Sequence, residues 1–254
     1  MVIQVALKNK ANESASVLDD SVLEEYNESI ERFNPTLRGN LSKYSQSKGM
    51  LTGSSPLMQV HLLDTGLLPG DARIIDRKEL ETAKSKSKKF LQGDYTNFGL
   101  ALVTAGDSYT PNDLPAKVLA EELKQRGINL GKGKLIPLTA FTLQEDGNSQ
   151  YGSVFKLNDK ANKDDFLDLE SFKWDYSRNE GLSCALLGRA RGWDADFRAL
   201  GDSVGIGRVA VVSGKATSRK ILENHLSSFR QERDAEIAEV QRKYAEREAL
   251  LRAE

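Results

Sequence analysis

Short apolar runs alternate with amphipathic stretches over the first 215 residues of the chain. The runs are only a few residues long and predict strands, which cover residues 2–7, 57–63, 98–103, 182–187 and 208–212. Apolar residues at three- and four-residue spacing predict helices over about 20–33, 76–91 and 114–126. Asp113 is a predicted helix cap, and Asn34 followed by Pro35 ends the first of these helices.

Two segments have patterns of a different kind. Leu135–Leu143 and Tyr151–Leu157 flank the turn-forming residues Glu145–Asn148, which predicts a β-hairpin. Residues 38–56 contain many Ser, Gly and Lys residues, which predicts a flexible loop or linker.

The C-terminal stretch has the most regular pattern of the chain, because residues 216–254 contain neither Gly nor Pro. Its apolar side chains recur about every 3.6 residues, the period of a straight amphipathic helix. The stripe consists of Leu222, Leu226, Phe229, Ile237, Val240, Tyr244 and Leu251, interrupted by Arg233. The sequence therefore predicts one long helix over residues 216–254.

These elements predict an α+β fold for residues 1–215, with a mixed or antiparallel sheet and several helices, followed by the long C-terminal helix. An α/β fold is the alternative, because residues 57–127 alternate strand and helix.

The end of the C-terminal helix is the predicted interaction surface. Beyond Arg233 most positions are charged, which leaves a narrow apolar seam of Ile237, Val240, Tyr244 and Leu251. We expect residues 234–254 to contact a second subunit or another protein, or to project into solvent. The alternative is a solvated helix that lies along its own core.

The charge balance excludes a globally basic nucleic-acid binder, because 36 Lys and Arg residues face 37 Asp and Glu residues. A local basic patch remains as an alternative, at the end of the helix over 76–91. Its lysines are candidates to neutralise phosphates, and Phe90, Tyr95 and Phe98 are candidate stacking residues. The alternative is a solvated helix end whose neighbouring aromatics belong to the core. The patch consists of Lys84, Lys86, Lys88 and Lys89, extended by Lys132 and Lys134.

Catalytic signatures are scarce. The single Cys184 lies in an apolar run and is predicted to be buried, and with His61 and His225 it offers too few ligands for a zinc site. Gly214 and Lys215 follow a predicted strand, but neither the first Gly nor the hydroxyl of a P-loop stands in its place.

Aspartates supply the remaining catalytic candidates. Asp107 follows an apolar strand, and Asp194 and Asp196 form a closely spaced pair, so a metal-dependent enzyme is a further alternative. The acidic residues of 164–170 are predicted to form a solvated face.

The sequence thus favours a non-enzymatic structural or assembly protein with no cofactor and no bound metal. Its expected partner is a protein or a second copy, reached through residues 234–254, and nucleic acid is the alternative. The chain has neither a signal-peptide pattern nor about 18 consecutive apolar residues, so we expect a cytoplasmic protein without a membrane span.

Overall fold

The computed structural model describes residues 4–7, 13–91, 93–106, 110–177, 181–188, 192–196 and 198–214. By its contacts the chain divides into two units, residues 1–214 and 215–254. The predicted C-terminal helix, with Ile237, Val240, Tyr244 and Leu251, lies outside the described residues and stays a prediction.

The helices of the described part are α1 (Leu23–Ile30), α2 (Pro35–Leu41), α3 (Pro56–Asp64), α4 (Arg77–Lys86) and α5 (Asp113–Gln125). Short 3-10 turns join or extend them, at Asp20–Val22, Thr110–Asn112, Leu138–Ala140, Lys163–Asp165 and Leu169–Ser171. None of the helices in this part is both long and apolar enough to cross a bilayer.

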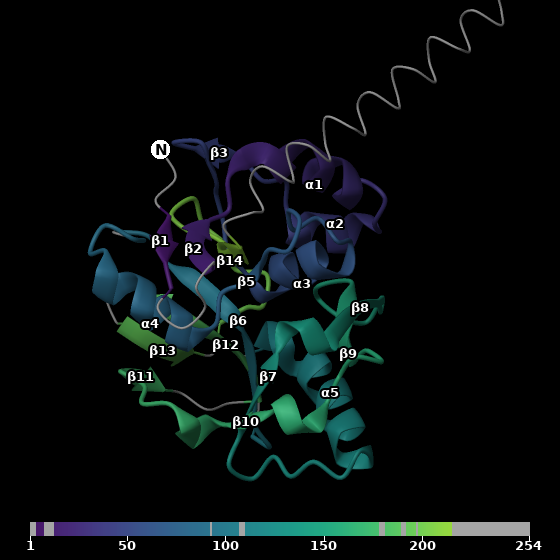
Figure 1. Ribbon diagram of the computed structural model, residues 1–254. Coiled ribbons are helices and arrows are strands. Elements are labelled where there is room, and N and C mark those ends of the chain that lie inside the picture. The colour runs from purple at the N-terminus through teal and green to yellow at the C-terminus, as the bar shows by residue number, and fades with distance from the viewer. Residues whose placement is uncertain are drawn as a thin grey trace, which may run out of the picture. The chain divides into compact units, whose positions relative to one another are not determined.

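Two larger sheets organise the fold (Figure 1). The first has the order β1 (Val5–Ala6), β2 (Glu13–Val17), β14 (Ala210–Gly214) and β5 (Arg73–Ile74), and all its pairs are antiparallel. The second has the order β10 (Leu167–Asp168), β7 (Lys134–Pro137), β6 (Thr96–Val103), β12 (Leu182–Gly188), β13 (Gly192–Asp196) and β11 (Tyr176–Ser177).

Strand direction decides between the two predicted fold classes. In the second sheet only β11 and β13 pair in parallel, and its other strand pairs are antiparallel. Two hairpins add further antiparallel pairs, β3 (Gln46–Ser47) with β4 (Met50–Leu51), and β8 (Phe141–Glu145) with β9 (Ser153–Leu157). The described part is therefore α+β, as predicted, and the hairpin predicted on either side of Glu145–Asn148 is confirmed.

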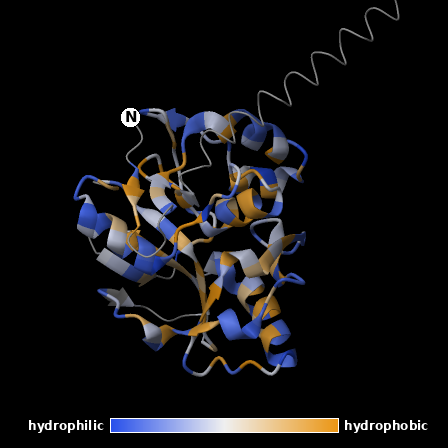
Figure 2. Ribbon diagram, in the orientation of Figure 1, coloured by the Kyte–Doolittle hydropathy of each residue, from blue (hydrophilic) through white to orange (hydrophobic). Residues whose placement is uncertain are grey.

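The six-stranded sheet is covered on both faces. Alternate side chains of β6 point to opposite sides, because strand residues alternate faces. Ala101 and Val103 belong to the core packed beneath α1, α2, α3 and α5. Phe98, Leu100 and Leu102 belong to the core formed with α4 and the first sheet. In Figure 2 the apolar colour follows α3 and the central strands, whereas α4 is mostly hydrophilic.

The strand predicted for residues 57–63 is wrong, because these residues form α3. Ser55 caps this helix by accepting a hydrogen bond from the Met58 amide at 3.2 Å, and Pro56 occupies its first turn. The helix is buried from Pro56 to Leu62, so it shows no polar face. A short apolar run of this kind does not distinguish a buried strand from a buried helix.

The segment 38–56, predicted as a flexible loop or linker, has regular secondary structure. It contains the end of α2 and the β3–β4 hairpin, and the side chains of Leu41, Tyr44 and Leu51 are buried. Lys48 and Gly49 both have positive φ, +61° and +73°, which makes the tight turn that a two-residue hairpin requires.

Three predicted boundaries change. Helix α4 ends at Lys86 and not at residue 91. The segment 135–143 is divided between β7 and β8, which belong to different sheets. The residue before α5 is Asn112 and not Asp113, and its side chain makes no cap hydrogen bond because it takes part in a buried network described below.

Candidate functional site

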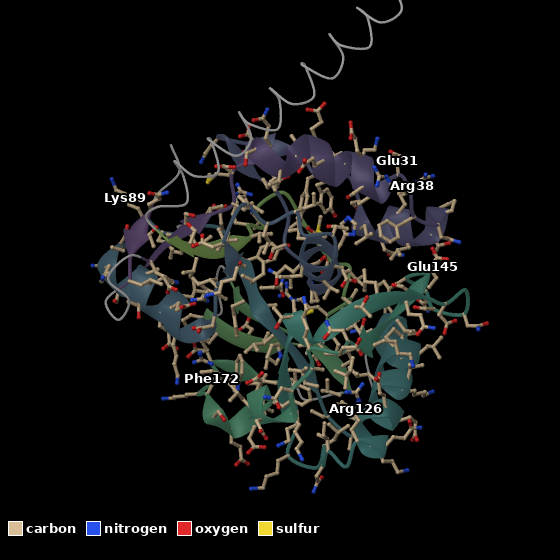
Figure 3. All side chains as sticks on the ribbon, turned by 45° about the vertical axis from the view of Figure 1, so that its right-hand side comes forward. Glu31, Arg38, Lys89, Arg126, Glu145 and Phe172 are labelled. Atoms are coloured by element: carbon tan, nitrogen blue, oxygen red, sulfur yellow. The ribbon has the colours of Figure 1, made fainter. Side chains whose placement is uncertain are left out.

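The predicted lysine patch lies at the end of α4. Lys84 is half-buried, whereas Lys86, Lys88 and Lys89 are exposed. Figure 3 shows Lys89 at the edge of the molecule, pointing outward. Lys86 donates a hydrogen bond to the carbonyl of Ala6. Positive charge at this position also favours the C-terminal end of the helix dipole.

Lys132 and Lys134 do not extend that patch as freely available cations. The Nζ of Lys134 lies 2.7 Å from Asp168 Oδ1, and the Nζ of Lys132 lies 3.7 Å from Glu170 Oε2. The hydrogen bond and charge of Lys134 lower the pKa of Asp168. The two lysines thus pair with carboxylates of the exposed 164–170 segment.

The aromatic residues predicted to stack on bases are core residues. Phe90 and Phe98 are each 1% exposed and Tyr95 is 9% exposed. Phe98 belongs to the core beneath α4, where its ring stacks against Trp174. Of the two interpretations of these three aromatics, burial therefore supports core packing and not stacking at the surface.

The carboxylate candidates do not assemble a metal site in the part of the chain that the structure describes, since no group of three or more His, Cys, Asp or Glu side chains converges there. Asp194 is fully buried on β13. Asp196 stands two residues further along the same strand, and Asp107 lies outside the described residues.

Cys184 and His61 are both buried. Cys184 is 3% exposed on β12, which confirms its predicted burial. His61 lies on α3, with its ring edge-on to Tyr26 and Phe33, and its Nε2 is 2.7 Å from the hydroxyl of Ser29. The Ser29 hydroxyl also donates to the carbonyl of Tyr26, and its contact with His61 joins α1 to α3.

His61 makes stability depend on pH. Burial lowers its pKa from 6.5 to about 4, although Asp64 acts in the opposite direction. Below pH 6.5 the unfolded chain binds a proton that the folded chain does not, so stability falls with decreasing pH. We expect about 2 kcal/mol to be lost between pH 6.5 and pH 4.5 through this residue. Urea unfolding of His61→Gln should show a correspondingly shallower loss.

The same measurement can contradict this prediction. Parallel curves for wild type and His61→Gln would show that carboxylates alone carry the acid sensitivity.

A cavity of about 260 Å³ lies between the second sheet and the segment 198–206. The sheet side of its wall includes Tyr95, Asn97, Cys184, Leu186 and Asp194. The segment side includes Arg198, Asp202, Val204 and Ile206.

Strand register places three of these residues in one row. Leu186 of β12 is directly opposite Asn97 of β6 on one side and Asp194 of β13 on the other. Residues opposite each other on neighbouring strands share a face of the sheet. Asn97 and Asp194 thus lie on either side of the apolar Leu186 in the cavity wall.

Hydrogen bonds hold the later half of the segment 198–206 over this row. Ser54 is the centre, because its Oγ accepts from the Asn97 amide at 3.0 Å and its amide donates to Ser203 Oγ at 3.0 Å. The Tyr95 hydroxyl donates to the Ser54 carbonyl at 3.2 Å and accepts from the Val204 amide at 3.1 Å.

A second network holds the start of the segment. The side-chain amide of Asn112 donates to the carbonyl of Arg198 at 2.7 Å and to that of Leu182 at 3.0 Å. The Tyr151 hydroxyl donates to Asn112 and accepts from the Leu200 amide at 2.8 Å. The segment is therefore fixed at both ends by buried polar side chains.

Sequence reasoning missed a further cluster, the aromatic cage around Arg77. The guanidinium carbon of Arg77 lies 4.7 Å from the ring centroids of Phe172 and Trp193 and 4.8 Å from that of Trp174. Its Nε donates to Glu81 at 2.9 Å, and another nitrogen donates to the carbonyl of Lys173. The side chain is only 5% exposed. The spacing of the aromatic residues Phe172 and Trp174 was the available signal, but nothing in the sequence indicated that Arg77 is the cation they contact.

Comparison with models of known protein families, with curated proteins and with solved structures finds no match to this chain.

Proposed function

We propose that this chain is an assembly protein, in which residues 1–214 form a folded body and the seam of residues 234–254 binds a second copy or another protein. The observation that carries the proposal is the apolar stripe, which keeps helical spacing from Leu222 to Leu251. An isolated helix with so narrow an apolar face gains most of its stability by packing it against a partner.

The described folded body ends with strand β14, before the residues that carry the apolar stripe. β14 ends at Gly214 and pairs on one side with β2 and on the other with β5. Among the described residues only three large apolar side chains are exposed, Leu167, Val204 and Ile206, so this part of the chain offers a partner little apolar surface.

Paired substitutions in the full chain test the proposal. Ile237→Asp with Val240→Asp puts two charges into the seam, and we expect the assembled species to dissociate to monomers in sedimentation equilibrium. Ala235→Asp with Ala238→Asp adds the same charge to positions away from the seam and should preserve the assembly. Equal masses for the two double variants would contradict the proposal.

Nucleic-acid binding is the second candidate, favoured by the exposure of Lys86, Lys88 and Lys89 at one helix end. A salt-dependent gel shift with single-stranded DNA tests it. Replacing these lysines by Gln should abolish the shift, whereas Lys132→Gln should leave it unchanged because Lys132 faces Glu170.

A further inference from the structure

A second cavity, the α4 cavity, lies beside the first residues of α4, where the two cores of the fold meet. On its wall, Ile74 and Leu138 belong to the core beneath α1, α2, α3 and α5. Ile75, Phe98 and Leu100 belong to the core formed with α4 and the first sheet. Its volume of about 300 Å³ lies at the lower end of the range of about 300–1,000 Å³ that small-molecule sites occupy.

Strand pairing leaves room for this cavity. β7 pairs with Leu100–Val103 of β6 and not with residues 96–99. It ends at Pro137, whose nitrogen has no hydrogen to donate to a strand ladder. Phe98, Gly99 and Pro137 all line the cavity. The α4 cavity therefore lies beside the half of β6 that β7 does not reach.

Most of the wall of the α4 cavity is apolar, and one side of it is open to solvent. Ile75, Phe98 and Leu138 are each at most 1% exposed. Leu167 is 39% exposed and Thr139 is also exposed. Because buried and exposed residues share this wall, an aliphatic chain can enter from the surface and cover its carbons against buried apolar side chains.

The wall also carries cations at the start of α4. Lys78 is exposed, and its ammonium makes neither an ion pair nor a hydrogen bond with the described residues. Arg77 is 4% exposed, and its Nη1 is buried without a hydrogen-bond partner among the described residues. Its Nε and its third nitrogen bond to Glu81 and to the Lys173 carbonyl, and neither of these residues lines the cavity. A buried donor without an acceptor is costly, so an acceptor that reaches it is strongly favoured.

The other charged groups of the wall do not offset these cations. Arg73 pairs with Glu79 and Glu13, and the Asp76 carboxylate accepts the Glu79 amide as the cap of α4. Asp165 is exposed, so water and salt screen its carboxylate. The first amides of the ten-residue helix α4 add partial positive charge. The wall therefore favours an anionic head group over a cationic one.

We propose that the α4 cavity binds a small aliphatic carboxylate, such as a medium-chain fatty acid. The carboxylate pairs with Lys78 and accepts a hydrogen bond from Arg77. The hydrocarbon chain lies against Phe98, Leu138 and Leu167. This function is additional to assembly through residues 234–254.

Titration calorimetry of the full chain with four matched probes tests the ligand class. We expect octanoate to bind saturably at one site, octanol to bind at least fivefold more weakly because it lacks the charge, and octylamine at least tenfold more weakly. Acetate should not bind, because it lacks the hydrocarbon chain. Equal binding of octylamine or octanol, or no saturable binding of octanoate in the millimolar range, would overturn the proposal.

Charge reversal locates the head group. Lys78→Glu changes an exposed residue in the first turn of α4, where a carboxylate favours the helix, so the variant should fold. We expect it to weaken octanoate binding at least tenfold. Lys160→Glu makes the same change at an exposed lysine outside the cavity and should leave binding unchanged. Equal affinities of the two variants would overturn the proposal.

Methyl NMR locates the hydrocarbon chain independently of the charge. Ile74 and Ile75 line the α4 cavity, whereas Ile30 is buried elsewhere and does not. Saturating octanoate should shift the methyl resonances of Ile74 and Ile75 and leave that of Ile30 unchanged. Octanoate binding without a shift at Ile74 or Ile75 would place the ligand elsewhere on the protein and overturn the proposal.

Discussion

We expect Gly207→Ala to lower the free energy of unfolding by about 3 kcal/mol, because Gly207 crosses the chain at Gly53 with no room for a side chain. A Cβ at position 207 would stand 2.7 Å from the Ser54 nitrogen, 2.8 Å from the Gly53 carbonyl carbon and 2.8 Å from the Tyr95 ring. The first two contacts are backbone atoms and cannot rotate away. The Gly53 amide also donates to the Gly207 carbonyl at 2.8 Å, so these two backbone segments cannot move apart without losing this hydrogen bond.

Gly205 is the matched control on the same segment. A Cβ there meets nothing within 4 Å, and its φ is not positive. Gly205→Ala should change stability by less than about 0.5 kcal/mol. Urea unfolding with an unchanged m-value measures both effects. If the two alanine variants unfold at the same urea concentration, the close crossing of residues 53 and 207 is not a feature of the folded protein.

Arg77→Ala should cost about 4 kcal/mol. The substitution removes a guanidinium from contact with three aromatic rings, each contact contributing about 1 kcal/mol, and breaks its hydrogen bond to the Lys173 carbonyl. The rings lie on the 172–174 segment and on β13, so the cage joins these to α4. Unfolding in urea, followed by tryptophan fluorescence of Trp174 and Trp193, reports the loss directly at the cage.

Two further variants separate the cage from the charge. Arg77→Lys keeps the charge but not the planar group that stacks between rings, so it should recover less than half of the loss. Arg126 pairs with Glu122 at 3.0 Å on the exposed face of α5, and Arg126→Ala should cost less than about 0.5 kcal/mol. Arg77→Ala and Arg126→Ala of equal stability would show that the cage contributes nothing beyond a surface ion pair.

The elements with a local signal were predictable from the sequence. Asp76 caps α4 by accepting a hydrogen bond from the Glu79 amide at 2.8 Å, and the Glu79 side chain accepts one from the Asp76 amide. This reciprocal capping pattern involves two residues three positions apart, so it can be recognised in the sequence. The β8–β9 hairpin has a turn between two alternating runs. In contrast, α3 was predicted as a strand, because a helix buried on all sides has no polar face to reveal its period.

The cavity between the second sheet and the segment 198–206 could not be predicted, because it forms through strand pairing between residues that are far apart in the sequence. Asn97, Leu186 and Asp194 are far apart along the chain and meet only because β6, β12 and β13 pair in one register. A polar Asn97 next to a predicted apolar strand was the only local sign. The lysines were recognised, but the partners Asp168 and Glu170 that accompany Lys134 and Lys132 became visible only when β10 paired with β7.

The central claim is that residues 234–254 hold this protein in an assembly. The most direct test is light scattering of the full chain and of a chain that ends after Asp234, over a range of concentrations. We predict that the full chain has at least twice the mass of one chain and that the shortened protein is a folded monomer. A full chain that is monomeric at all concentrations, or a shortened protein that assembles as the full chain does, would contradict self-assembly through these residues.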